Sequence, residues 1–585
     1  MNLSKRKIET GKCILSNILI LFSFFVASYL YMYVFLKGGY STIASDRFFH
    51  IERFEEAYRN FKTGHVFSMI STFSSLRVGQ AIGTYYPSGN LIVYAIIRSI
   101  IHKPVTSIFI FFMIGRFIGF VVSYYSCKCV TKRRDISYVF SILYTLCPYM
   151  MFNDYARYDV GESWASIFIP MAFSGLYIVL FRKERFKGSL LLGLGMALIT
   201  YSHILSTVFA IIILMIIYVT TLNIQNDRIN SFKFIAVSVF IYIISTAGFI
   251  IPFIKSMLTN EVQNPQTEFF NISIKMSRLV SESLKNGIDI PNVGFILIIA
   301  SLIGLFSLYK RDKRDIFERY IYVYGVILLI FSTSLFPWGE MSNTAVSIIQ
   351  FPWRILTFAI MFLSLYASMI TCNADFKALK YIVILLTVLF SISAISQRRD
   401  NSLVKSKEDP APSELWFMKL NNDNYSTAIS INRDTDSAVM VRDYLPKGSI
   451  PKVNDIYNHN AYVNCKRYGV RKKDIKSGYQ EETFTLNDVT SKKADIILPF
   501  VVYDVSNYKL TVNGRNEKLK VDKYSRAKIE KAKEIRNINM KIKYITPTYI
   551  VVFRYVSFIS IIVIFVILLA DEWVSFYRRI INLDD

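Results

Sequence analysis

Stretches of apolar residues, each close to the length of a membrane crossing, recur along this chain and limit its fold more than any other feature. A helix needs about 20 apolar residues to cross the hydrocarbon core of a bilayer. Roughly thirteen candidate runs meet or approach that length, at about 14–36, 86–101, 105–126, 136–152, 163–181, 189–201, 204–222, 232–254, 291–309, 318–336, 353–372, 380–397 and 548–570. Charged residues make up only 19% of the chain, which is low for a soluble protein. The sequence therefore predicts an α-helical polytopic membrane protein.

The positive charges predict how the chain lies in the membrane. The formal net charge is +25, which in a soluble protein would suggest a nucleic-acid partner. Here many lysines and arginines gather in short loops between apolar runs, at 128–134, 182–187 and 310–314. Short basic loops stay on the cytoplasmic side, next to anionic lipid. We therefore expect the bilayer, and no nucleic acid, as the partner of this charge.

Both chain ends are expected in the cytoplasm, because basic residues precede the first run and follow the last. The first run is too long for a cleaved signal peptide. The Lys-, Ile- and Asn-rich composition is typical of an AT-rich bacterial genome, so we expect a bacterial plasma membrane. Two cytoplasmic ends need an even number of crossings, about 12. The run at 86–101 fits least, since it is short and carries Arg98, and we expect a re-entrant or interfacial segment there or at a neighbouring run.

Three domains are predicted from the distribution of apolar runs. Residues 1–397 form a transmembrane domain, and residues 548–585 form the last transmembrane helix with a cytoplasmic tail. Residues 398–547 lie outside the membrane and contain alternating patches such as Ala438–Val441 and Tyr508–Val512. Asn513-Gly514 directly after the second patch is a strong hairpin signal. We expect a mainly β domain there, a small sandwich.

The first polar interval, beginning at Asp46, contains the first candidate site residues. Apolar and charged residues alternate from Asp46 to Thr63 at helical spacing, which predicts an amphipathic helix on the membrane surface with Ser45 or Asp46 as its N-cap. Asp46 is either that cap or a general base, because sugar transfer to a hydroxyl needs a carboxylate to accept the proton. His50 lies one helical turn later on the same face, as a metal or phosphate ligand or as an ordinary surface histidine.

Further ionisable residues lie in or beside apolar runs, where they are costly and therefore candidates for function. They are Arg116, Arg157, Asp159, Glu162, His203, Glu340 and Arg354. The carboxylates between 153 and 162 suit a divalent metal or an acceptor, and Arg157 suits a phosphate; a solvated loop is the alternative. Arg354 suits an anionic head group or an interfacial anchor. A buried, hydrogen-bonded histidine is the alternative for His203.

Motifs of soluble nucleotide-dependent enzymes are missing from the sequence. It has no Gly-x-Gly-x-x-Gly after a strand, no P-loop and no His-Glu-x-x-His. A nucleotide sugar or ATP bound in the usual way is therefore not expected.

The order of these features resembles a known superfamily. An acidic residue in the first outer loop, an amphipathic helix and an apolar segment led by Tyr86 and Pro87 resemble the GT-C superfamily of membrane glycosyltransferases. More narrowly, the chain resembles the YfhO-like membrane proteins, a family that includes those labelled 6-pyruvoyl-tetrahydropterin-synthase-related. The features that carry this likeness are Ser45–His50, Tyr155–Glu162, Ser202-His203, Gln350–Arg354 and, in the β region, 498–514 with Tyr544.

This resemblance implies a GT-C-like fold and transfer of a sugar, with inversion, from a polyprenyl-phosphate donor to a cell-surface glycopolymer on the outer face of the membrane. Asp46 matches the family's catalytic acid. Some relatives have a pair of acids where this chain has Asp46-Arg47, so the need for a divalent metal stays open. Arg157, Glu162 and Arg354 match the family's polar motifs. We expect substrate binding by these three and by the other candidates, His50, Tyr86, Arg116, Asp159, His203 and Glu340.

Two other functions fit parts of the same pattern. A transporter or flippase for a lipid-linked glycan would also use arginines in the membrane, but it needs neither a carboxylate base nor a β domain. A non-catalytic assembly partner in envelope synthesis would use the β domain for binding alone.

Overall fold

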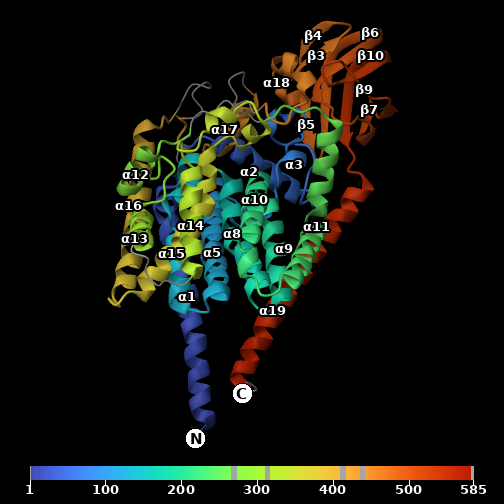
Figure 1. Ribbon diagram of the computed structural model, residues 1–585. Coiled ribbons are helices and arrows are strands. Elements are labelled where there is room, and N and C mark those ends of the chain that lie inside the picture. Colours follow the sequence, from blue (N-terminus) through green and yellow to red (C-terminus); the bar gives the residue numbers. More distant parts are fainter. Residues whose placement is uncertain are drawn as a thin grey trace.

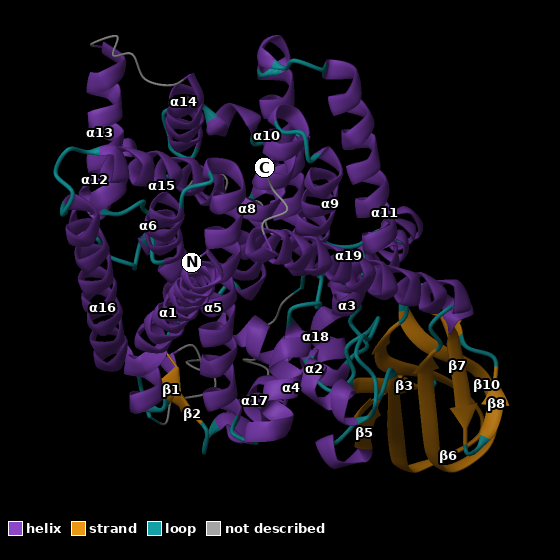
Figure 2. Cartoon of the chain, turned by 90° about the horizontal axis from the view of Figure 1, so that it is seen from below, coloured by secondary structure: helices purple, strands orange, loops and turns teal. Residues whose placement is uncertain are grey.

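The computed structural model describes residues 2–41, 43–264, 273–309, 316–408, 417–434 and 442–581. Helices form the larger part, and an antiparallel β-sheet lies at one end of the bundle (Figure 1). Both chain termini lie at the opposite end (Figure 1). In the view from below, the sheet lies to one side of the helices, next to α19 (Thr548–Ile581) (Figure 2).

Seven helices in the described part of the chain are long and apolar enough to cross a membrane. They lie within α1 (Asn2–Gly38), α5 (Pro104–Thr131), α8 (Val160–Phe181), α11 (Arg228–Thr259), α15 (Leu356–Asn373), α16 (Leu379–Lys405) and α19. Large apolar side chains remain exposed along α11 and α19, among them Leu258 and Tyr555. Because exposed apolar surface of this extent suits lipid and not water, these helices make the chain a multi-pass membrane protein.

The other predicted runs correspond to shorter helices. They are α4 (Leu91–Ile101), α6 (Arg134–Thr145), α9 (Arg185–Ser202), α10 (Ile204–Thr220), α13 (Phe295–Tyr309) and α14 (Ile316–Phe331). At 1.5 Å per residue, the 11 residues of α4 extend about 17 Å, well short of a core about 30 Å thick. The prediction that 86–101 does not cross agrees with this length. The count of 12 crossings stays a prediction, and the basic loop 310–314 lies outside the described residues.

Close helix packing sets the centre of the bundle. Nearly all of α15 is buried, so this helix is surrounded by protein. On α8, Gly175 faces α9 so closely that a Cβ added there would lie 2.3 Å from the backbone nitrogen of Leu192. Small residues at such crossings let two helices approach each other where no hydrophobic force from water drives them together. The backbones of α8 and α9 therefore pack closely together at Gly175.

The helix after the first span is α2 (Arg47–Lys62), and its position differs from the prediction. It was expected on the membrane surface, but most of its side chains are buried in protein, including the charged ones of Arg47, Arg53 and Glu56. The Glu56 carboxylate accepts hydrogen bonds from the backbone N–H groups of Phe73 and Ser74 at 2.9 Å. An amphipathic pattern shows which face is polar, but not whether water or backbone donors satisfy that face.

The β region consists of one sheet instead of the expected sandwich. Its order is β4-β3-β6-β10-β7-β8, with β5 on β6 and β9 on β10, all antiparallel. Its two longest strands, β6 and β10, pair with each other. Register shifts along this pairing bend the two strands around an apolar core. The strands are β3 (Asn460–Val463), β4 (Lys466–Gly469), β5 (Ile475–Gly478), β6 (Glu481–Val501), β7 (Tyr508–Val512), β8 (Arg515–Glu517), β9 (Lys520–Val521) and β10 (Arg526–Tyr544).

The predicted hairpin is confirmed. Val512 pairs with Arg515 across Asn513 and Gly514, which both have positive φ. The other alternating patch, Ala438–Val441, lies outside the described residues.

The segment before the sheet is tied to the membrane helices. The expected boundary at 398 falls inside α16, which continues to Lys405. Strand β2 (Leu420–Asn421) pairs with β1 (Tyr40–Ser41), directly after the first span. The remaining short helices are α3 (Ile82–Tyr85), α7 (Pro148–Met151), α12 (Met276–Lys285), α17 (Tyr425–Asp434) and α18 (Val453–Tyr457). The predicted domains 398–547 and 1–397 therefore share contacts close to Asp46.

Candidate active site

Asp46 stands at the N-cap position of α2, but its side chain makes no capping hydrogen bond. The carboxylate instead lies 3.2 Å from Nε of Arg157. The backbone N–H of Asp46 also donates to the carbonyl of Arg157 at 2.9 Å. The sequence left two readings of Asp46 open, a helix cap and a functional carboxylate. The geometry argues against the cap, because a capping side chain would be turned toward its own helix.

Arg157 connects three carboxylates. Its Nη1 lies 2.9 Å from Glu162, its Nη2 lies 3.1 Å from Asp159, and its Nε faces Asp46. A guanidinium suits this position because it presents five donors in one plane and stays charged when buried. Arg354 joins from another element, with its Nε 3.4 Å from Glu162. We call these five residues the Asp46 network.

The local backbone explains how 157–162 reach this arrangement. A short π-helical turn, η2 (Phe152–Arg157), ends at Tyr158, which has a φ of 65° in the left-handed region. Asp159 then caps α8, since its side chain accepts the backbone N–H of Glu162 at 3.0 Å. One irregular turn therefore directs Arg157, Asp159 and Glu162 to the same side, at the buried start of a membrane helix.

Asp46 is the accessible member of the network. Its side chain is 38% exposed, whereas those of the other members are 7% exposed or less. Its surroundings are nevertheless dense with protein, and burial raises the pKa of Asp46 even though Arg157 opposes the shift. An open carboxylate in a partly dry recess with a raised pKa is well suited to accept a proton.

Two further residues of α2, His50 and Arg53, lie next to the network on the side of Asp159. His50 Nε2 lies 3.9 Å from Asp159, and Arg53 Nη1 lies 3.1 Å from His50 Nδ1. Because an arginine can only donate, Nδ1 accepts and the proton of neutral His50 is on Nε2. Burial, with the nearby Arg53 charge, holds the pKa of His50 well below its usual value. His50 is therefore neutral, and its Nε2–H faces Asp159 beyond hydrogen-bond distance.

Arg53 was not among the residues predicted from the sequence. It is buried, its guanidinium lies 4.0 Å from the ring centre of Tyr86, and its Nη2 donates to the Pro87 carbonyl at 2.5 Å. Among the described residues it has no carboxylate within ion-pair distance, unlike Arg157 and Arg354. In the sequence it looks like one more charge on an amphipathic face. Only its burial, which the sequence does not reveal, marks it out.

Tyr86 and His203 adjoin the network from the loop before α4 and from the junction of α9 and α10. Tyr86 donates to Asp159 at 3.5 Å, and its ring centre lies 6.0 Å from those of both His50 and His203. His203 Nδ1 also pairs with the Ser206 hydroxyl at 2.9 Å. A Cβ at Gly161 would lie 2.4 Å from the Tyr86 hydroxyl, so only glycine leaves that hydroxyl its place.

Two predicted residues lie away from the network. Arg116 is buried in a separate pair with Asp154, 3.0 Å from its carboxylate, and Tyr31 donates to that carboxylate at 2.7 Å. Buried charges within membrane helices pair with one another, as Arg116 and Asp154 do. Glu340 is exposed on the short turn η5 (Trp338–Met341), with no contact to the network among the described residues.

The network does not provide the ligands of a metal ion. Across the described residues, no group of three or more His, Cys, Asp or Glu side chains is close enough to hold one. The three carboxylates of the network each form an ion pair with Arg157. The guanidinium therefore occupies the position between them that a cation would need.

An apolar cavity of about 250 Å³ lies beside the network. Phe168 of α8, Phe249 of α11 and Phe558 of α19 contribute to its lining. Its lining also contains Arg554, and it contains Ser88–Asn90 and Ser202, the chain neighbours of Tyr86 and His203. Asn90 donates to the Val160 carbonyl at 3.4 Å, next to Asp159. A space lined by membrane helices therefore approaches the buried side of the site.

Comparison with known proteins gives distant structural matches alone. No protein-family model and no curated protein matches the chain. The arabinofuranosyltransferase AftD from Mycobacteria matches with 13% identity and a TM-score of 0.40, over 64% of this chain and 26% of its own. The Archaeoglobus fulgidus oligosaccharyltransferase matches with 10% identity and a TM-score of 0.42, over 74% of this chain and 60% of its own.

ArnT from Cupriavidus metallidurans, bound to undecaprenyl phosphate, matches with 9% identity and a TM-score of 0.32, over 72% of this chain and 75% of its own. The chain thus spans about a quarter of AftD and three fifths of the oligosaccharyltransferase. With overlaps this partial, the function has to be argued from the site.

Proposed function

We propose that this protein is a membrane glycosyltransferase of the GT-C type that uses a polyprenyl-phosphate sugar. The observation that carries the proposal is the position of Asp46. It is the one accessible carboxylate of a buried Arg–carboxylate network, and an apolar cavity between membrane helices is lined by Ser88 and Ser202, chain neighbours of Tyr86 and His203 beside that network. A lipid-linked sugar needs an apolar space for its chain, cations for its phosphate and a base for the acceptor.

The reaction assigns a task to each part. The acceptor hydroxyl oxygen attacks the anomeric carbon and gives its proton to Asp46, while the bond from that carbon to the phosphate oxygen breaks. The configuration inverts, and polyprenyl phosphate leaves with the bonding electrons. Arg53 and Arg354 stabilise the negative charge that develops on the phosphate, since donors fixed in a dry site do this best. Arg157 orients Asp46 and is itself held by Asp159 and Glu162.

The resemblance to the YfhO-like proteins supports a finer proposal for the acceptor. The proposed acceptor is a cell-surface glycopolymer outside a bacterial plasma membrane. The β region helps to bind this polymer. The site residues proposed for substrate binding are His50, Tyr86, Arg157, Asp159, Glu162, His203 and Arg354, to which we add Arg53. The reaction as written needs no metal.

A glycan profile of the cell envelope tests this function. A strain that lacks the protein is complemented with the natural chain, with Asp46→Asn or with Asp289→Asn. Asp289 is a matched control, since it is also half exposed and paired with an arginine, Arg398 at 2.5 Å, but has no contact with the network. We expect one glycan to vanish without the protein and to return with the natural chain and with Asp289→Asn, but not with Asp46→Asn. An unchanged profile in the deletion strain would refute the proposal.

A further inference from the structure

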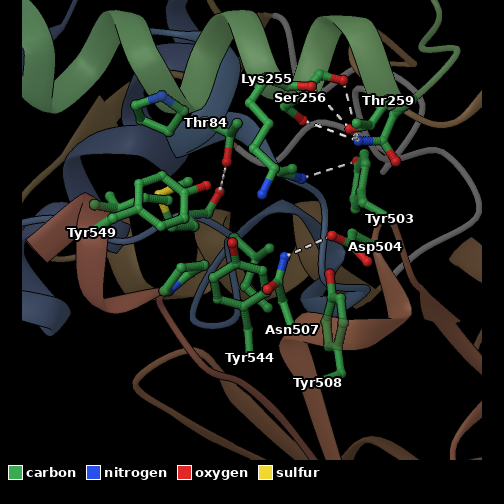
Figure 3. Close-up of a pocket in the computed structure, with 17 residues that line it drawn as sticks. Thr84, Lys255, Ser256, Thr259, Tyr503, Asp504, Asn507, Tyr508, Tyr544 and Tyr549 are labelled. Atoms are coloured by element: carbon green, nitrogen blue, oxygen red, sulfur yellow. Dashed lines mark hydrogen bonds between the residues drawn. The ribbon is translucent and has the colours of Figure 1, made fainter.

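A second pocket lies where the sheet meets the ends of two membrane helices. Its lining joins the last turns of α11, the first turn of α19 and the start of the β7 region. The residues that carry the argument are Lys255, Asp504, Asn507, Tyr544 and Tyr549. Figure 3 shows the Lys255 side chain reaching from α11 toward the polar ends of Tyr549, Tyr544 and Asn507.

The Lys255 ammonium group lacks a carboxylate partner. No ion pair joins it to another described residue, and it lies over the ring of Tyr549, 5.0 Å from the ring centre. Asp504 lines the same pocket, but its carboxylate serves its own turn, accepting the Ser506 hydroxyl at 2.7 Å and the Asn507 amide at 3.2 Å. A cation that faces hydroxyl and amide groups, without a counter-ion, is suited to an external anion.

The size of the pocket limits the anion. Its volume of about 40 Å³ is room for roughly three water molecules, which is the scale of one phosphate group. The lining also contains the Asp504 carboxylate, which repels a second negative charge and accepts a donor. A phosphodiester that carries a hydroxyl or ammonium group a few bonds away meets both requirements.

The residues around the pocket indicate the source of such a ligand. Leu258 on α11 is 82% exposed and Tyr555 on α19 is 65% exposed, both within two turns of the pocket residues. These are lipid-facing surfaces, and a lysine beside a tyrosine at the end of a membrane helix lies at head-group level. We propose that this pocket binds the phosphodiester head group of a membrane lipid, and thereby fastens the β region to the bilayer beside α11 and α19.

This site is separate from the Asp46 network, so its test uses binding and not sugar transfer. The purified full-length protein is titrated with phosphatidylglycerol, with phosphatidylcholine and with inorganic phosphate, and its Tm is recorded. We expect phosphatidylglycerol to raise Tm by several degrees, because a ligand that binds the folded state stabilises it. Phosphatidylcholine, whose head group has no donor for Asp504, is expected to raise Tm much less.

The variants assign the effect to Lys255. Lys255→Gln is expected to lose most of the phosphatidylglycerol shift, while Lys255→Arg keeps it. Lys447→Gln, at an exposed lysine of the β region outside the pocket, is the matched control and should also keep it. An equal shift in Lys255→Gln and in the natural chain would overturn the proposal. A Lys255-dependent shift with inorganic phosphate, and none with phosphatidylglycerol, would overturn the lipid as the source of the phosphate.

Discussion

At the scale of single residues, the contact between Asp46 and Arg157 is central to the proposed site. A carboxylate at a helix N-cap would normally accept its own helix's N–H groups, but Asp46 turns to Arg157 instead. Arg157 in turn is surrounded by acids that would repel one another without it. The network therefore stabilises this part of the fold, and it also positions Asp46, the proposed base.

Removing the central arginine is expected to destabilise the protein strongly. Arg157→Ala leaves three carboxylates without their shared partner in a mostly buried place. The loss of one partner from a buried pair costs about 3–5 kcal/mol. Arg133→Ala, which breaks an exposed pair with Asp135, should cost about 0–1 kcal/mol. Thermal unfolding of both variants in the same detergent measures the difference, and equal Tm values would show that the network does not stabilise the fold.

The pH dependence of transfer reports on Asp46. Asp46 must be ionised to accept a proton, and burial raises its pKa. Activity is therefore full well above that raised pKa and falls as the pH drops through it. We expect the acidic limb of kcat/KM to lie above pH 4, since an unperturbed aspartate titrates at about 3.9. A limb at or below the ordinary aspartate value would mean that Asp46 is not the titrating group.

At the scale of elements, α2 and the start of α8 build the site, and α8 depends on its packing against α9. The sequence predicted a helix from Asp46 to Thr63, and the structure has α2 there. The pattern could not show that α2 is buried, because the partners of Glu56 are backbone groups of the later segment 72–74. For the same reason Arg53 was overlooked as a site residue.

Gly175 offers a direct test of the α8–α9 contact. In Gly175→Ala the new methyl group would overlap the backbone of α9, which cannot move as a flexible side chain can. Overpacking of a tight interior costs about 1–3 kcal/mol, so we expect a lower Tm and less folded protein. Gly11→Ala is the control, since no atom lies within 4 Å of the added group. A Gly175→Ala protein as stable as Gly11→Ala would contradict this packing.

At the scale of the whole molecule, the sequence predicted membrane helices followed by a β region, and the structure has both. Apolar length and alternation are local properties, so α5, α8 and the hairpin after Tyr508 were within reach of the sequence. The way in which these elements pack together could not be predicted from the sequence. Which arginine meets which carboxylate depends on contacts between distant segments, as Arg116 with Asp154 shows. The same limit hid the single sheet and the pocket around Lys255.

The central claim is that Asp46 accepts the proton while arginines hold the lipid phosphate, and one measurement separates these tasks. Purified protein is given a polyprenyl-phosphate sugar, and both its binding and the release of polyprenyl phosphate on transfer are measured. General-base catalysis contributes about 10²–10⁴-fold. Asp46→Asn should therefore bind the donor like the natural protein but release polyprenyl phosphate slower by that factor, while Arg354→Gln should bind it more weakly. An Asp46→Asn protein that transfers sugar at the natural rate would contradict the account.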